Sequence, residues 1–127
     1  MDLSALVGPD IEAGRQFVND LERNDVPVTA ALWQFDRLYS EEWELDIVTP
    51  IADEMGHKLA YRKVKDTLSR TAAASTINPL RLSVYAPGEP FIRNLRAKFL
   101  GRNDVVIPGA QPVGDHTIER GYIYFVK

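Results

Sequence analysis

The chain of 127 residues contains no cysteine and only two histidines. The absence of cysteine excludes disulfides, thiolate zinc sites, iron–sulfur clusters and cysteine nucleophiles. No apolar run reaches the ~18 residues of a membrane-spanning helix, and no glycine-rich phosphate loop, dinucleotide fingerprint or Gly-x-Ser-x-Gly motif is present. The first residues lack the basic start and long apolar stretch of a signal peptide. We therefore expect a cytoplasmic protein with no membrane partner.

The composition is that of a globular protein, with 45% apolar and 26% charged residues. A chain of this length predicts a single domain, residues 1–127. Such a domain buries about two thirds of its unfolded surface, which is enough for a core without disulfides.

The net charge of −3 conceals a strong asymmetry along the chain. Residues 1–57 carry three basic and thirteen acidic side chains, whereas residues 58–127 carry twelve basic and five acidic ones. This pattern predicts an anionic partner for the basic part, a basic partner for the acidic part, or self-association. The alternative is that the two halves interleave in space and their charges mix.

Apolar residues at helical spacing predict three helices, over residues 10–23, about 57–74 and 90–100. Pro9, Pro50 and Pro90 suit the first turns of helices, and Gly56 weakens the turn before His57. Alternating apolar and polar residues predict strands over 28–36, 43–48, 80–86, 105–107 and 117–126, with a loop over 110–116.

The resulting order, α-β-β-α-β-α-β-β, predicts an α/β (α+β two-layer) domain with a mixed sheet of about five strands. We expect the three helices to lie mainly on one face of this sheet. Three helices are too few to cover both faces, so the other face should be partly open. Strand alternation places these polar residues on it: Gln34, Asp36, Glu44, Asp46, Arg81, Ser83 and Tyr85.

The missing catalytic motifs, the expected open face and the divided charge favour a non-enzymatic protein-interaction or accessory module. Such a face would dock to another protein or associate with a second copy of the chain. We expect Tyr39, at the tip of the first hairpin, and Arg81 and Tyr85 to contribute to the interface.

A nucleic-acid-binding protein is the first alternative. The second and third predicted helices carry basic residues that could neutralise phosphates: Lys58, Arg62, Lys65, Arg70, Arg93 and Arg96. The isoelectric point of about 5.3 weighs against this function, and a solvated helix face explains the same pattern.

A metal-dependent phosphodiesterase or nuclease is the second alternative. Asp36, Glu44 and Asp46 share one face of the first hairpin and could bind Mg or Mn, with His116 as a general base. A solvated acidic hairpin without a cofactor is the simpler expectation. Arg81 on a neighbouring strand could neutralise the acids instead.

Overall fold

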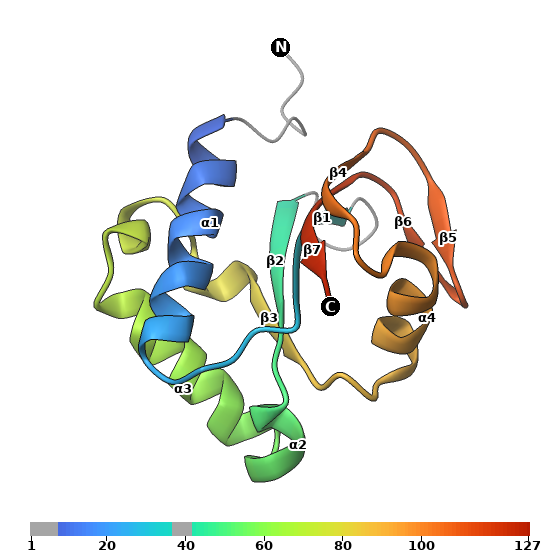
Figure 1. Ribbon diagram of the computed structural model, residues 1–127. Coiled ribbons are helices and arrows are strands. Elements are labelled where there is room, and N and C mark those ends of the chain that lie inside the picture. Colours follow the sequence, from blue (N-terminus) through green and yellow to red (C-terminus); the bar gives the residue numbers. More distant parts are fainter. Residues whose placement is uncertain (1–7, 37–41) are drawn as a thin grey trace.

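A mixed five-stranded sheet forms the centre of the computed structural model, which describes residues 8–36 and 42–127 (Figure 1). The strand order is β3-β2-β1-β7-β4. β2 and β3 are parallel, and the other neighbours are antiparallel. The strands are β1 (Ala30–Asp36), β2 (Glu42–Val48), β3 (Leu82–Tyr85), β4 (Asn103–Ile107) and β7 (Gly121–Val126). The predicted mixed sheet is therefore confirmed.

The described helices pack on both faces of the sheet (Figure 1). On the first face are α1 (Gly8–Arg23), α2 (Ile51–Met55) and α3 (His57–Ser69), and on the second is α4 (Pro90–Phe99). Gly56 has φ +88°, a conformation that favours glycine and separates α2 from α3. Within the described ranges, no helix is long and apolar enough to cross a bilayer.

The first core lies between the sheet and helices α1 and α3. It follows from two periodicities, because every third or fourth residue of these helices meets every second residue of the strands. Phe17 and Leu21 of α1 and Val64 of α3 are fully buried there, together with Leu45 and Ile47 of β2.

The second face is also covered, which corrects the expectation of an open sheet face. Ile92, Leu95 and Phe99 of α4 pack with Leu32 and Ile123 in a separate core. A two-stranded hairpin of β5 (Gln111–Val113) and β6 (His116–Ile118) lies beside α4. The sequence predicted a loop and one long strand over this region, because strands of three residues are too short to show alternation.

The predicted third strand begins later than expected. Residues Pro79–Arg81 form a short 3-10 helix, since the Asn78 side chain accepts a hydrogen bond from the Leu80 backbone. Leu80, expected to point inward, is 82% exposed. A second 3-10 helix, Ala72–Ser75, replaces the last turn of the predicted second helix.

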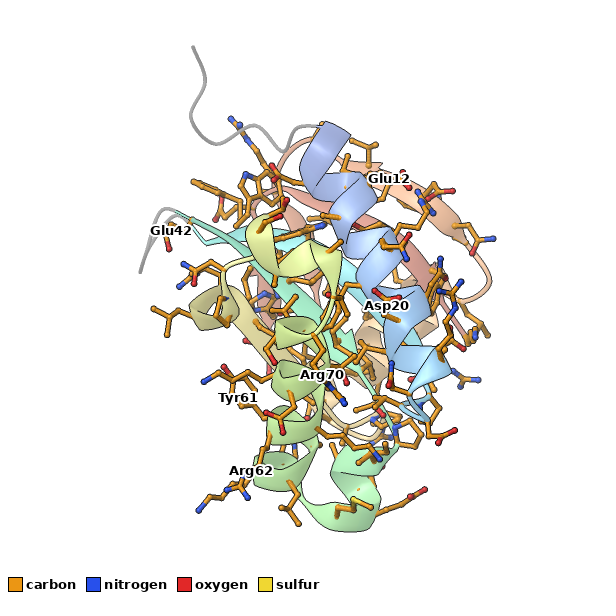
Figure 2. The ribbon with its side chains drawn as sticks, turned by 90° about the vertical axis from the view of Figure 1, so that its left-hand side faces the viewer. Glu12, Asp20, Glu42, Tyr61, Arg62 and Arg70 are labelled. Carbon is orange, nitrogen blue, oxygen red and sulfur yellow. The ribbon has the colours of Figure 1, made fainter. Side chains whose placement is uncertain are left out.

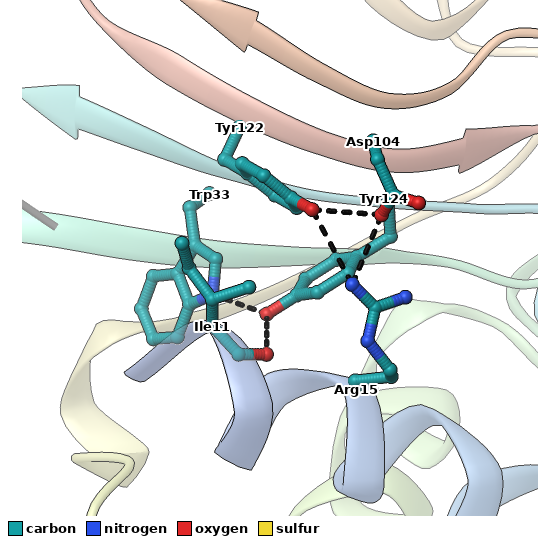
Figure 3. A network of polar contacts seen from close by, with 6 residues as sticks. All are labelled: Ile11, Arg15, Trp33, Asp104, Tyr122 and Tyr124. Carbon is teal, nitrogen blue, oxygen red and sulfur yellow. Dashed lines mark hydrogen bonds and ion pairs between the residues drawn. The ribbon is translucent and has the colours of Figure 1, made fainter. Parts of the chain in front are cut away.

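A polar network holds α1 against the sheet (Figure 3). Arg15 of α1 lies 3.0 Å from the Asp104 carboxylate of β4, and the Tyr122 hydroxyl donates to the same oxygen at 2.7 Å. The hydrogen bond with Tyr122 and then that with Arg15 lower the pKa of Asp104. This network fixes the start of β4 relative to α1.

Candidate functional site

Three polar side chains form a hydrogen-bonded network on the α4 side of the sheet. His116 Nε2 lies 2.8 Å from Gln34 Oε1, and Gln34 Nε2 donates to Asp46 Oδ2. Because an amide oxygen only accepts, His116 must carry its proton on Nε2, and its Nδ1 is the basic atom when the ring is neutral. β6, β1 and β2 each supply one of these residues.

Asp46, at one end of this hydrogen-bonded network, is fully buried. Burial raises the pKa of Asp46 well above its usual range, and a hydrogen bond with Glu44 and the charge of Glu44 raise it further. The Gln34 hydrogen bond and the charge of Arg81 act in the opposite direction. Among the described residues, nothing hydrogen-bonds to the other carboxylate oxygen, Asp46 Oδ1, so the neutral acid is the favoured form at this position.

Two of the residues expected at an interface, Arg81 and Tyr85, lie beside the hydrogen-bonded network of His116, Gln34 and Asp46. Arg81 Nε is 3.2 Å from Glu42 Oε2, and the Arg81 side chain is only 21% exposed. Tyr85 packs edge-on against Phe91, and burial raises its pKa, as do the charges of Asp46 and nearby acids. Tyr39 lies outside the described residues. Arg81 and Tyr85 are thus largely occupied by contacts within the domain.

The structure brings together part of the expected metal site. Glu44 and Asp46 are in contact, and His116 reaches Asp46 through Gln34. The backbone of Asp36 pairs with Glu42, one position from Glu44 in the strand register, but the Asp36 side chain lies outside the description. The described residues contain no group of three carboxylate or histidine side chains that could hold a metal ion.

Gln34 was not predicted as a site residue. Alternation placed it on the polar face of β1, but its burial, with 6% exposed, depends on α4 and β6 covering that face. The one available signal was an uncharged polar residue between Trp33 and Phe35. This signal does not identify its partners.

The basic residues fall on opposite sides of the sheet. Lys58, Arg62, Lys65 and Arg70 belong to α3 and the residue following it, and Figure 2 shows Arg62 and Arg70 on this side of the domain. Arg93 and Arg96 belong to α4, which packs against the other face. The six residues therefore do not form one continuous nucleic-acid surface.

A groove of about 460 Å³ runs along β4, an edge strand of the sheet. Among the described strands, β4 pairs only with β7. Val106, the fourth of the five residues of this strand, is 66% exposed. The groove is lined by Phe99, Arg102 and the segment from Val105 to Gln111.

A second groove, of about 390 Å³, lies between α1 and α3 on the side shown in Figure 2. Asp20 and Arg70 line it, together with Gln16 and Asn24. Asp20 already pairs with Arg23 at 3.7 Å and accepts from Gln16 at 3.4 Å. Contacts within the domain therefore occupy its acidic group.

Comparison with protein-family models, with curated proteins and with solved structures finds no match to this chain.

Proposed function

We propose that this chain is a non-catalytic protein-interaction domain that binds its partner along the free edge of β4. The observation that carries this proposal is an edge strand that has one hydrogen-bonded neighbour among the described strands and whose residues line a groove. The expected cytoplasmic setting remains part of the proposal. The sequence predicted an interface on a sheet face. We propose a sheet edge instead, because packed helices cover both faces.

The physical basis is the set of backbone N–H and C=O groups that an edge strand leaves unpaired. An extended segment of another protein can satisfy them by adding a strand to the sheet. Proteins usually protect such edges with charged side chains or covering segments. On β4 the one charged side chain, Asp104, is paired with Arg15 and Tyr122 of the domain itself, and Val106 faces solvent.

The other edge of the sheet is less suitable. β3 has four residues, and the 3-10 helix Pro79–Arg81 contacts β2 immediately before it. Arg81 and Glu42 form an ion pair beside this edge. An added strand would meet these side chains before the backbone.

A structural role explains the hydrogen-bonded network of His116, Gln34 and Asp46 better than a catalytic one. Its acid is fully buried, and neither of the two grooves described above is lined by its residues. Metal-dependent phosphodiester hydrolysis therefore gains no support from the described residues, and we do not propose it further.

The test is selection of peptides from a random displayed library on the immobilised chain, followed by hydrogen exchange of the chain with each selected peptide. We expect selected peptides to protect the β4 amides. Val106→Lys should abolish selection, because a lysine on the edge opposes strand addition. Leu80→Lys, at another exposed apolar residue, beside the β3 edge, should leave it unchanged.

Two outcomes would overturn the proposal: no enrichment of any peptide, or protection confined to a surface other than β4. Protection of β4 that rises with protein concentration in the absence of peptide would support the edge as the interface. It would assign a second copy of the chain as the partner.

A further inference from the structure

The helix and turn that precede β4 carry charge of one sign. From Phe91 to Asn103 the chain has four basic residues and no acidic one: Arg93, Arg96, Lys98 and Arg102. All four are exposed. Because α4 packs on the face that also contains Val105 and Ile107, this positive charge lies on one side of the β4 edge.

Arg102 is the basic residue that lines the groove, and local structure holds it there. Gly101 adopts φ +79° and donates its N–H to the Val126 carbonyl at 2.8 Å, which turns the chain from α4 into β4. The Arg102 guanidinium lies 5.6 Å from the centre of the Phe99 ring, an arrangement that restrains a cation through the ring's quadrupole. None of the residues lining the groove is acidic.

The opposite side of the edge combines the exposed Val106 with an ion pair that neutralises its own charges. Val106 is paired with Tyr122, which packs in the core under α1, so its side chain is on the α1 side. The acid on that side, Asp104, is neutralised by Arg15 at 3.0 Å. A strand added to β4 would alternate between these two environments with a period of two residues.

A second copy of the chain fits this edge poorly. Antiparallel pairing of two β4 strands about a two-fold axis leaves equivalent faces on the same side of the combined sheet. It would therefore bring both Arg102 side chains and both α4 helices to one side, where like charges repel. The charge distribution favours a different occupant, with acidic residues on the α4 side.

We infer that the β4 edge binds an extended protein segment in which acidic and apolar residues alternate. The acidic side chains would face Arg102 and the apolar ones would face Val106. This inference rests on the proposed function, and it adds the chemistry of the partner.

The test uses three labelled heptapeptides in which valine alternates with glutamate, glutamine or lysine. Binding is followed by fluorescence anisotropy, and the contact surface by hydrogen exchange. We expect the glutamate peptide to bind about three- to tenfold more tightly than the glutamine peptide at low salt, since exposed ion pairs contribute modestly and several act together. The difference should shrink at about 1 M salt, where screening acts within ~3 Å.

Charge reversal identifies the residue responsible. Arg102→Glu should reverse the preference toward the lysine peptide, whereas Arg62→Glu on α3 is the matched control and should leave it unchanged. Equal binding of all three peptides at β4 would overturn the acidic preference and leave the proposed function standing. No binding at β4 by these peptides or by any library peptide would overturn both.

A single-stranded oligouridine of twelve nucleotides separates the remaining class of partner. Binding of this RNA that protects β4 and is lost in Arg102→Glu, without binding of the glutamate peptide, would overturn the inference. The surface would then be a nucleic-acid site.

Discussion

The indole N–H of Trp33 donates to the hydroxyl of Tyr124 at 2.8 Å, inside the core between α1 and the sheet. The same hydroxyl donates to the Ile11 carbonyl at 2.6 Å, so one oxygen connects β1, β7 and the first turns of α1 (Figure 3). Burial raises the pKa of Tyr124, which keeps the hydroxyl protonated and able to donate. These two hydrogen bonds fix α1 on the sheet.

Tyr124→Phe should therefore destabilise the domain. The substitution leaves the Trp33 N–H and the Ile11 carbonyl without partners, which costs about 1–3 kcal/mol. Chemical denaturation measures the change. Tyr122→Phe is the control, because its hydroxyl bonds to the exposed Asp104 and its removal should cost less. Equal losses in the two variants would contradict this account.

Gly14→Ala should also destabilise the domain, through a different mechanism. A Cβ at Gly14 would overlap the Tyr124 hydroxyl and lie 3.0 Å from Trp33 Nε1. Overpacking of this kind costs about 1–3 kcal/mol, although alanine favours helix. Gly88→Ala is the matched control, since nothing lies within 4 Å of its Cβ position. A denaturation midpoint for Gly14→Ala at or above that of the native protein would show that α1 can move away from the sheet without loss of stability.

Asp46→Asn should change how stability depends on pH. The pKa of Asp46 is raised in the folded state, so the native chain binds a proton there more tightly than the unfolded chain does. This contribution is fully present below the unfolded pKa of about 3.9 and is lost as pH rises through the folded value. An asparagine can accept from Gln34 and carries no charge at any pH. The free energy of unfolding of Asp46→Asn, measured relative to that of the native protein, should therefore be about 1–3 kcal/mol more favourable at pH 8 than at pH 4.

The measurement is urea denaturation of both chains at pH 4, 6 and 8. Asp53→Asn, at an exposed acid of α2, controls for the loss of one carboxylate. If the difference in free energy of unfolding between Asp46→Asn and the native protein were constant over this range, Asp46 would not hold its proton more tightly in the folded state than in the unfolded one.

Asp104 combines an exposed ion pair with an unusual backbone. Its φ is 54°, a region that asparagine tolerates and β-branched residues avoid. Asp104→Asn should cost less than about 1 kcal/mol, because surface ion pairs contribute little. Asp104→Val should cost about 1–2 kcal/mol more. Thermal unfolding of the two variants tests this difference, and equal melting temperatures would show that the start of β4 changes its conformation freely.

Much of the fold could be predicted from local sequence. The alternation of Trp33 with Gln34 and of Leu45 with Asp46 correctly assigned opposite faces of the first hairpin, and Gly56 indicated the break between α2 and α3. The hairpin of β5 and β6 could not be predicted, because its stability comes from Val113 and Ile118 packing in the α4 core. The packing of α4 and this hairpin on the second face of the sheet depends on contacts between residues distant in the sequence, which no local pattern reveals.

The candidate sites were less predictable than the fold. Sequence alternation grouped Gln34, Glu44 and Asp46 on one face, but it could not show that α4 and β6 bury Gln34 and Asp46 there. The edge position of β4 depends on β7 inserting between β1 and β4, a pairing between distant parts of the chain. Position in a sheet is set by this topology, whereas a strand is recognised from its own residues.

The insertion of β7 between β1 and β4 has a consequence for synthesis of the chain. β7 is translated after every other described strand of the sheet, and β4 has no neighbour among these strands until β7 emerges. The first hairpin and β3 can assemble earlier, but the groove beside β4 forms only when the last strand is in place. A partner that binds at this edge therefore distinguishes a chain in which β7 has paired with β4 from one in which it has not.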